Sequence, residues 1–484
     1  MPTRKSLLFS FLDRYAGLLI SVASSMVIAR LLTPTEIGVF SVTMVLLAFV
    51  ATVRDMGAGQ YLVQERDLTT ERIRAVWAVQ LGLGFALACL VVVASYPVAI
   101  FYNEPRMRDI MLLVALNYLI NPFGSLTYAW LMREMRFQSV AMMRFLSATS
   151  GAFVAIWLAW KGLGPISLAF GSLASTVVNA LVAVYFRPKF FPWLPGIHEI
   201  RRVLAFGSKL TFSTIIRTLE NGAPELLLGK LQSLGAAGMF SRSNGLVQMF
   251  NRLIVDAVAS VCLPWFAKQS REQGSFVEPF LKATAYVTAI GWSFCLALIC
   301  LAHPIVRVLY GAQWDQSVDL TRLIAAAMLF AVPATLCGTA LLSAGAVATI
   351  GRVTALAAIQ GVALVAVGAS QGLMPMGLAI IAASVITASL WLQAISKHLD
   401  LSLFALLRSL RSSMLVALMA SIGPAISLWI YGPYPESSAM PLVFGGITGS
   451  VGFLAGVMIF DHPLREEILT AAAKLKSILP SSST

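Results

Sequence analysis

Long stretches of apolar residues, separated by short polar or Pro/Gly-containing breaks, run through almost the whole chain. Most are at least about 20 residues long, the length that a helix needs to cross the hydrocarbon core of a bilayer. The apolar residues are continuous rather than alternating with polar ones, which excludes the strands of a membrane barrel. We count fourteen candidate spans, at 7–32, 36–57, 75–101, 109–131, 139–160, 163–186, 205–231, 234–264, 279–301, 317–343, 350–369, 372–396, 411–433 and 440–460.

The composition agrees with this pattern. Hydrophobic residues make up 58% of the chain and charged residues 12%, whereas soluble domains average about 45–50% apolar and about 25% charged. Too little polar surface remains to keep 484 residues in water, which excludes a cytosolic enzyme, a disordered chain and a secreted disulfide scaffold. The cysteines and histidines show no metal-ligand spacing, so we expect no metal and no other cofactor. The sequence predicts an all-α polytopic membrane protein with about fourteen transmembrane helices.

Lysine and arginine concentrate in alternate loops, which predicts the orientation in the membrane. With the N-terminus inside, the outer loops receive only Arg106, Arg108, Lys161 and Arg307. We therefore expect an even number of spans and both termini in the cytoplasm.

A weak internal repeat predicts two pseudo-symmetric six-helix lobes. Segment 28–41 matches segment 228–241, because Leu31, Gly38, Phe40 and Ser41 recur as Leu231, Gly238, Phe240 and Ser241. The shift encloses six spans, so both halves share one orientation, a transporter plan with the site at the interface of the repeats. The predicted parts are an N-lobe at 1–186, a cytoplasmic hinge loop at 187–204, a C-lobe at 205–396, two further spans within 397–460, and a cytoplasmic tail with an interfacial helix at 461–484.

Charged residues inside the predicted spans are candidates for function, because an ionised side chain in hydrocarbon is costly and usually faces a cavity or a partner. The first span of each half is rich in such residues. The arginines and acidic residues concerned are Asp13, Arg14, Arg54, Arg144, Arg217, Glu220, Arg242, Arg252 and Asp256. A structural alternative is that Arg217–Glu220 and Arg252–Asp256 neutralise one another as pairs three and four residues apart on one helix.

A cavity walled by guanidinium groups suits an anion, since arginine stays charged and binds phosphate through two parallel hydrogen bonds. We therefore predict a substrate-binding set of Arg14, Arg217, Arg252, Arg54, Arg144 and Arg242, and an ion-coupling set of Glu220, Asp256 and Asp13. The long apolar faces of the second half could hold a lipid tail. The chain contains no nucleotide-binding loop and no catalytic motif, so we expect neither direct ATP drive nor an enzyme.

The stretch 29–64 carries two motifs, "A-R-L-L-T-P-x-E-x-G-x-[FY]" and "D-x-G-x-G-x-x-L-[VI]-Q". They are formed by Ala29, Arg30, Leu31, Leu32, Thr33, Pro34, Glu36, Gly38 and Phe40, then by Asp55, Gly57, Gly59, Leu62, Val63 and Gln64. Through them the chain resembles the polysaccharide transporter family, the Wzx-type lipid-linked oligosaccharide flippases of the MATE-like superfamily.

The resemblance implies a secondary transporter of the bacterial inner membrane. Such proteins carry undecaprenyl-pyrophosphate-linked oligosaccharides, the repeats of exopolysaccharide or O-antigen, from the cytoplasmic to the periplasmic leaflet by alternating access. A related branch that flips the peptidoglycan precursor relies on arginines between its lobes. The matching positions here would be Arg14 and Arg217, and then Arg54 and Arg252. The implied partners are the lipid-linked substrate, membrane lipids, and as further candidates a polysaccharide polymerase and a chain-length regulator; no nucleic acid is expected.

Three alternatives stay open. A MATE-type exporter of organic cations would have twelve spans and acidic rather than basic residues in its cavity. A membrane-bound glycan polymerase or ligase would need a larger outer loop than this chain offers. A scaffold of polysaccharide assembly without transport of its own would tolerate substitution of Arg217.

Overall fold

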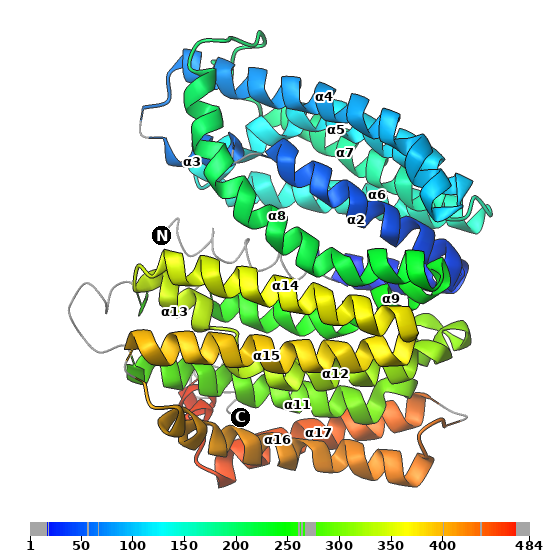
Figure 1. Cartoon of the computed structure of the whole chain (residues 1–484), viewed down its shortest axis with the longest axis vertical. Coiled ribbons are helices and arrows are strands. Elements are labelled where there is room, and N and C mark those ends of the chain that lie inside the picture. The colour runs from blue at the N-terminus through cyan, green and yellow to red at the C-terminus, as the bar shows by residue number, and fades with distance from the viewer. Residues whose placement is uncertain are drawn as a thin grey trace, which may run out of the picture. The chain divides into compact units, whose positions relative to one another are not determined.

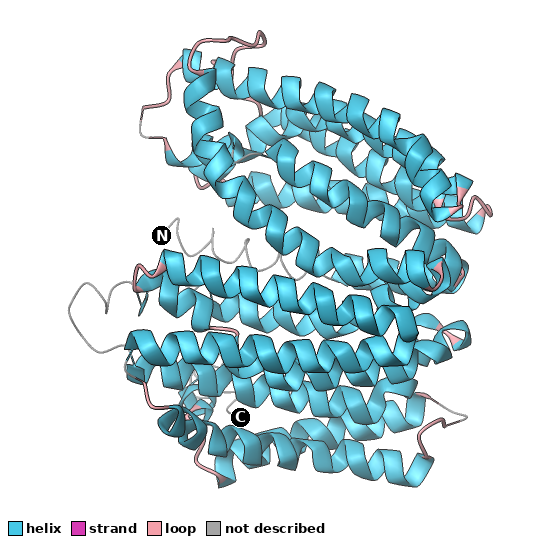
Figure 2. Cartoon of the chain, viewed as in Figure 1, coloured by secondary structure: helices cyan, strands magenta, loops and turns pink. Residues whose placement is uncertain are grey.

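The structure is a computed structural model, and it describes residues 17, 19–55, 58–65, 67–259, 262, 265–266, 277–399, 401–435 and 438–470. The described residues form helices and loops without a strand (Figure 2). Eleven of their helices are long and apolar enough to cross a membrane. The prediction of an all-α polytopic membrane protein is confirmed.

Three predicted spans, 7–32, 205–231 and 234–264, have no counterpart among these eleven helices. The first corresponds in part to a short apolar helix at Leu19–Leu31. The other two correspond to α8 (Ile200–Leu231) and to α9 (Leu234–Phe250), and neither is among the eleven. The count of fourteen therefore stays a prediction.

The chain divides into two compact units, Met1–Gly238 and Met239–Thr484, which we call unit 1 and unit 2. The helices of unit 1 are α2 (Pro34–Asp55), α3 (Ala58–Gln64), α4 (Thr70–Tyr102), α5 (Pro105–Arg133), α6 (Phe137–Trp160), α7 (Ile166–Phe186) and α8 (Figure 1). Within this unit α5 packs against both α4 and α7, α6 packs against α7, and α2 packs against α8.

Helix α8 belongs to unit 1, although the sequence places it in the second lobe. The hydroxyls of Thr52 in α2 and Thr218 in α8 are 3.3 Å apart. The Tyr102 hydroxyl donates to the carbonyl of Leu226 at 3.4 Å. The boundary between the two units thus falls inside α9. The predicted division into lobes at 187–204 is based on the sequence repeat rather than on packing, and it stays a prediction.

The predicted hinge loop is fixed to unit 1. Arg187, at the end of α7, lies with its guanidinium 4.0 Å from the ring centre of Trp193. The Trp77 indole of α4 donates to the carbonyl of Trp193 at 3.3 Å, and the Gly196 amide donates to the carbonyl of Arg74 at 3.1 Å. Cation–π contacts and backbone bonds therefore hold the loop on the start of α4. Residues 200–204 of the predicted loop are the first turn of α8.

Unit 2 contains the rest of α9, then α11 (Val277–Tyr310), α12 (Val318–Ala331), α13 (Cys337–Ser343), α14 (Val347–Gln371), α15 (Leu373–Leu399), α16 (Leu403–Tyr431) and α17 (Ala439–Ile459). Helix α16 packs against both α11 and α17, and α15 packs against both α12 and α14 (Figure 1). A short 3₁₀ turn at Val332–Ala334 contains Pro333 and separates α12 from α13, because proline cannot continue the hydrogen-bond ladder.

The described part of the predicted tail forms a helix at 464–470. Its apolar residues Leu464 and Ile468 pack on a buried cluster of α11, α16 and α17, formed by Ala289, Val416 and Val457. The segment is thus docked on the protein through the apolar face that its helical spacing predicts.

Candidate functional site

The first family motif forms the start of α2. Thr33 is the residue before the helix, and its amide donates to Glu36 Oε2 at 2.8 Å. In return the Glu36 amide donates to Thr33 Oγ1 at 3.3 Å. This reciprocal pair is a capping box, and Pro34 occupies the first helical position, where its missing N–H is not needed. Threonine, proline and glutamate in this motif therefore set where α2 begins.

Gly38 in the same motif permits a close helix contact inside unit 1. A Cβ atom at Gly38 would lie 1.7 Å from the carbonyl oxygen of Leu234, and a Cβ at Gly238 would lie 2.0 Å from the carbonyl oxygen of Pro34. No side chain fits at either position. The two glycines that match in the sequence repeat thus lie at one crossing of α2 with the start of α9.

The second family motif leads into α3, which is anchored by charged residues. Arg133 of α5 donates to the carbonyl of Leu62 at 2.9 Å and also to the carbonyl of Glu65. The Glu65 carboxylate, 12% exposed, pairs with Arg72 and with Arg202, each at 3.3 Å. Glu65 therefore ties α3 to α4 and α8. Sequence reasoning missed this residue, because its partners lie far apart in the chain.

Two of the predicted substrate-binding arginines make cation–π contacts with tyrosines of α5. The Arg54 guanidinium lies 5.6 Å from the ring centre of Tyr118. The Arg144 guanidinium lies 5.5 Å from the ring centre of Tyr128 and donates to its hydroxyl at 2.5 Å. These contacts orient both cations, because a tyrosine face attracts a guanidinium.

Arg217 and Glu220 lie one turn apart on α8 and do not form the predicted pair. Arg217 is exposed and Glu220 is half-buried. Within the part of the chain that the structure describes, neither makes an ion pair. Among the described residues no hydrogen bond or close ion pair joins the two side chains, although the charge of Arg217 acts on Glu220.

In unit 2 a chain of amide side chains leads along α9 to Arg252. Gln248 donates to Asn244 Oδ1 at 3.4 Å, and Asn251 donates to Gln248 Oε1 at 2.6 Å. At Asn251–Val255 the helix changes to a π-helical turn. Both Arg252 and the following Asp256 are exposed.

The alternative Arg252–Asp256 pair is not formed, since Asp256 makes no ion pair with any described residue. Arg252 lies in the π-helical turn and Asp256 directly follows it, where the i→i+5 bonding changes the spacing of side chains four residues apart. Such turns occur frequently at functional sites. The guanidinium of Arg242, two residues before Asn244, lies 5.8 Å from the ring centre of Tyr310.

The predicted set is thus distributed over both units. Arg54, Arg144, Arg217 and Glu220 belong to unit 1, and Arg242, Arg252 and Asp256 belong to unit 2. Asp13 and Arg14 lie outside the described residues. That these residues act as one site stays a prediction. Each unit presents guanidinium groups on its helices, and these groups can donate hydrogen bonds to phosphate oxygens.

Comparison with known proteins decides the family. The family model described as "Polysaccharide biosynthesis protein" matches residues 27–319, more than half of the chain. The chain belongs to this family. The resemblance of the two motifs in 29–64 to polysaccharide transporters is thereby confirmed.

Relatives of this polysaccharide biosynthesis protein include the succinoglycan biosynthesis transport protein ExoT of Rhizobium meliloti (strain 1021). It is 24% identical over 462 residues, covering 93% of this chain and 91% of the relative. The lipopolysaccharide biosynthesis protein WzxC of Escherichia coli (strain K12) is 22% identical over 302 residues, covering 62% of this chain and 61% of the relative.

Solved structures show the same fold. The lipid II flippase MurJ, in an inward closed conformation, matches with a TM-score of 0.76 at 14% identity, covering 96% of this chain and 99% of MurJ. An inward-facing multidrug resistance MATE transporter of the MOP superfamily matches with a TM-score of 0.63 at 14% identity, covering 81% of this chain and 96% of that transporter. The chain therefore shares the helical fold of these two proteins.

Proposed function

We propose that this polysaccharide biosynthesis protein is a transporter that flips a lipid-linked oligosaccharide, with a pyrophosphate between lipid and sugar, across the bacterial inner membrane. The observation that carries the proposal is the exposure of Arg217 and Arg252 within helices of a membrane domain. An ionised side chain in such a place faces water or a charged ligand rather than hydrocarbon. A phosphate-bearing substrate suits exposed guanidinium groups, because arginine binds phosphate through two parallel hydrogen bonds.

The relatives support the substrate class. ExoT is named as a transport protein of succinoglycan biosynthesis and WzxC as a lipopolysaccharide biosynthesis protein. MurJ is a flippase of lipid II. ExoT and WzxC are thus named for the synthesis of a polysaccharide, and ExoT and MurJ for transport or flipping, so we infer a transport role rather than a catalytic one for this chain.

The alternative of a MATE-type exporter of organic cations is less favoured. The match to the MATE transporter covers less of the chain than the match to MurJ does, and with a lower TM-score. The exposed arginines argue in the same direction, because they repel a cationic drug. A cation exporter would place carboxylates where this chain presents Arg217 and Arg252.

In the cycle that we propose, the pyrophosphate pairs with Arg217, Arg252 and Arg14, while Arg54, Arg144 and Arg242 line the path of the sugar. Neutralisation of these cations by the substrate lets the protein change from an inward-open to an outward-open state. A proton or a cation at Glu220, Asp256 or Asp13 resets the cycle. Both termini lie in the cytoplasm, and a polymerase and a chain-length regulator are the partners that receive the product.

The proposal is tested in cells in which this protein is the sole transporter for their exported polysaccharide. We expect Arg217→Ala and Arg252→Ala each to lower polymer output about tenfold or more, because a hydrogen-bonded charge contributes about 1.5–3 kcal/mol. The matched control is Arg352→Ala, an exposed arginine of α14 outside the proposed path. Wild-type output from both path variants, at wild-type protein levels, would contradict the proposal and favour a scaffold.

A further inference from the structure

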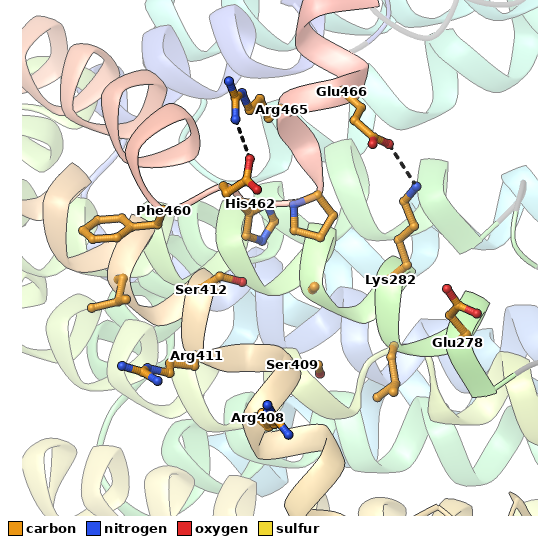
Figure 3. A pocket seen from close by; sticks show the side chains of 15 residues that line it. Glu278, Lys282, Arg408, Ser409, Arg411, Ser412, Phe460, His462, Arg465 and Glu466 are labelled. Atoms are coloured by element: carbon orange, nitrogen blue, oxygen red, sulfur yellow. Dashed lines mark hydrogen bonds and ion pairs between the residues drawn. The ribbon is translucent and has the colours of Figure 1, made fainter.

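A pocket in unit 2, with a cavity of about 790 Å³, lies where three helix ends meet. It is formed by the first turns of α11, the start of α16 and the segment that follows α17 (Figure 3). The two helices begin and α17 ends at this pocket, so it lies at one surface of the membrane. The distribution of basic residues in the loops predicts that this surface is cytoplasmic.

The pocket lining is charged, and most of its charges are already paired. Lys282 Nζ lies 3.7 Å from Glu466 Oε2, and Arg465 Nη1 lies 2.5 Å from Asp461 Oδ1. The first pair joins the segment after α17 to α11, and the second lies within that segment (Figure 3). One further carboxylate, that of Glu278, is in the first turn of α11, where the helix dipole favours it.

Two arginines of α16 complete the lining. Arg408 and Arg411 are three residues apart and therefore lie on one face of the helix. Both are exposed, and neither forms an ion pair or a hydrogen bond with a described residue. Figure 3 shows Arg411 and Glu278 on opposite sides of the view, with the guanidinium of Arg411 directed away from Glu278. Ser412 beside Arg411 adds a hydroxyl donor. The pocket thus has two guanidinium groups to offer to an anion.

The surroundings of Arg411 indicate where such an anion comes from. Exposed side chains follow one stripe of α16 at spacings of three and four residues. Apart from Arg411 they are Phe404, Leu407, Met414 and Leu418, which are 75%, 67%, 49% and 50% exposed. An exposed apolar stripe on a membrane-spanning helix contacts acyl chains. Arg411 therefore lies in line with the stripe, at the first residue of the predicted span 411–433.

We propose that this pocket binds the headgroup of an anionic membrane phospholipid. Arg408 and Arg411 hold the phosphate through charge-assisted hydrogen bonds, and the acyl chains lie along Met414 and Leu418. Basic pockets at the cytoplasmic ends of membrane helices match the anionic lipids of that leaflet. The site is made of residues of unit 2 alone and is independent of the proposed transport path.

Lipid binding to the purified full-length protein in detergent tests this proposal by native mass spectrometry. The probes are dioctanoyl phosphatidylglycerol, dioctanoyl phosphatidylcholine and inorganic phosphate. We expect phosphatidylglycerol to bind at least about tenfold more tightly than phosphatidylcholine. The double variant R408Q/R411Q should weaken phosphatidylglycerol binding about tenfold or more, since each lost bond involves a charge. The variant R408K/R411K, which keeps both charges, should retain part of the affinity.

Arg352→Gln is the matched control, because it removes an exposed arginine of unit 2 that does not line the pocket. Gel filtration and thermal melting establish that each variant is folded. Equal affinity for the two lipids, an equal loss in Arg352→Gln, or unchanged affinity in folded R408Q/R411Q would overturn the proposal. Displacement of the lipid by inorganic phosphate at equal concentration would assign the pocket to free phosphate instead.

Discussion

At the residue scale, the first family motif is explained by hydrogen bonding and close packing. Thr33 and Glu36 satisfy one another's backbone amides at the start of α2, and Gly38 leaves room for a neighbouring carbonyl. The spacing Thr-x-x-Glu is readable from the sequence as a capping box. The need for a glycine at position 38 cannot be predicted from the local sequence, because the carbonyl that it accommodates belongs to Leu234, almost two hundred positions along the chain.

Thr33→Ala should lower the stability of the protein by about 1 kcal/mol, since it leaves an amide at the start of α2 without its acceptor. Thr35→Ala is the matched control, because Thr35 is exposed and makes no hydrogen bond with a described residue. Thermal melting of the purified protein in detergent measures both. Equal melting temperatures for Thr33→Ala and Thr35→Ala would show that the capping box adds nothing to stability.

At the element scale, most spans are where the apolar pattern places them. The predicted span at 350–369 lies within α14, and that at 139–160 lies within α6. The break at Pro333 follows from proline itself. The π-helical turn at Asn251–Val255 could not be predicted, because it depends on backbone packing rather than on a residue type. The alternative pairing of Arg252 with Asp256, read from the regular helical spacing, is not formed beside this turn.

A buried histidine also contributes to the docking of the segment after α17. His462 is 1% exposed, and the amide of Leu464 donates to its Nδ1 at 3.2 Å. The neutral ring therefore carries its proton on Nε2, which donates to Ser413 Oγ at 3.0 Å. Burial lowers the pKa of His462 from 6.5 to about 4. A charged imidazole is thus disfavoured while the segment is docked.

Docking of this segment should weaken on acidification. When the segment is released, His462 binds a proton near pH 6.5; when the segment is docked, it does so only near pH 4. Between pH 6.5 and pH 4 the released state therefore binds more protons than the docked state and is favoured. The contribution of the neutral His462 to docking is fully present above about pH 6.5 and is lost progressively as the pH falls to about 4. Hydrogen exchange of the amides at 464–470 measures it. His462→Gln removes the titration while Asp461 and Glu466 remain, so an identical pH profile in this variant would contradict the assignment.

At the scale of the whole molecule, the sequence predicts the class of protein well and the sites poorly. Composition, spans and the motifs in 29–64 lead to a polytopic membrane protein of the polysaccharide biosynthesis family. The pocket beside Arg411 is assembled from helix ends that are far apart in the chain. The same holds for Glu65, whose partners come from α4 and α8. Apolar periodicity predicts helices, but not which helix ends meet.

The central claim is that the protein moves a pyrophosphate-linked glycan lipid across a bilayer with the help of exposed arginines. Translocation in proteoliposomes tests it most directly. Purified protein is reconstituted with undecaprenyl-pyrophosphate carrying a labelled oligosaccharide, and accessibility of the label in the far leaflet is followed over time. We predict protein-dependent flipping that falls about tenfold or more in Arg217→Ala and persists in Arg352→Ala. Flipping that is unchanged in Arg217→Ala, or absent with folded wild-type protein under an imposed ion gradient, would contradict the account.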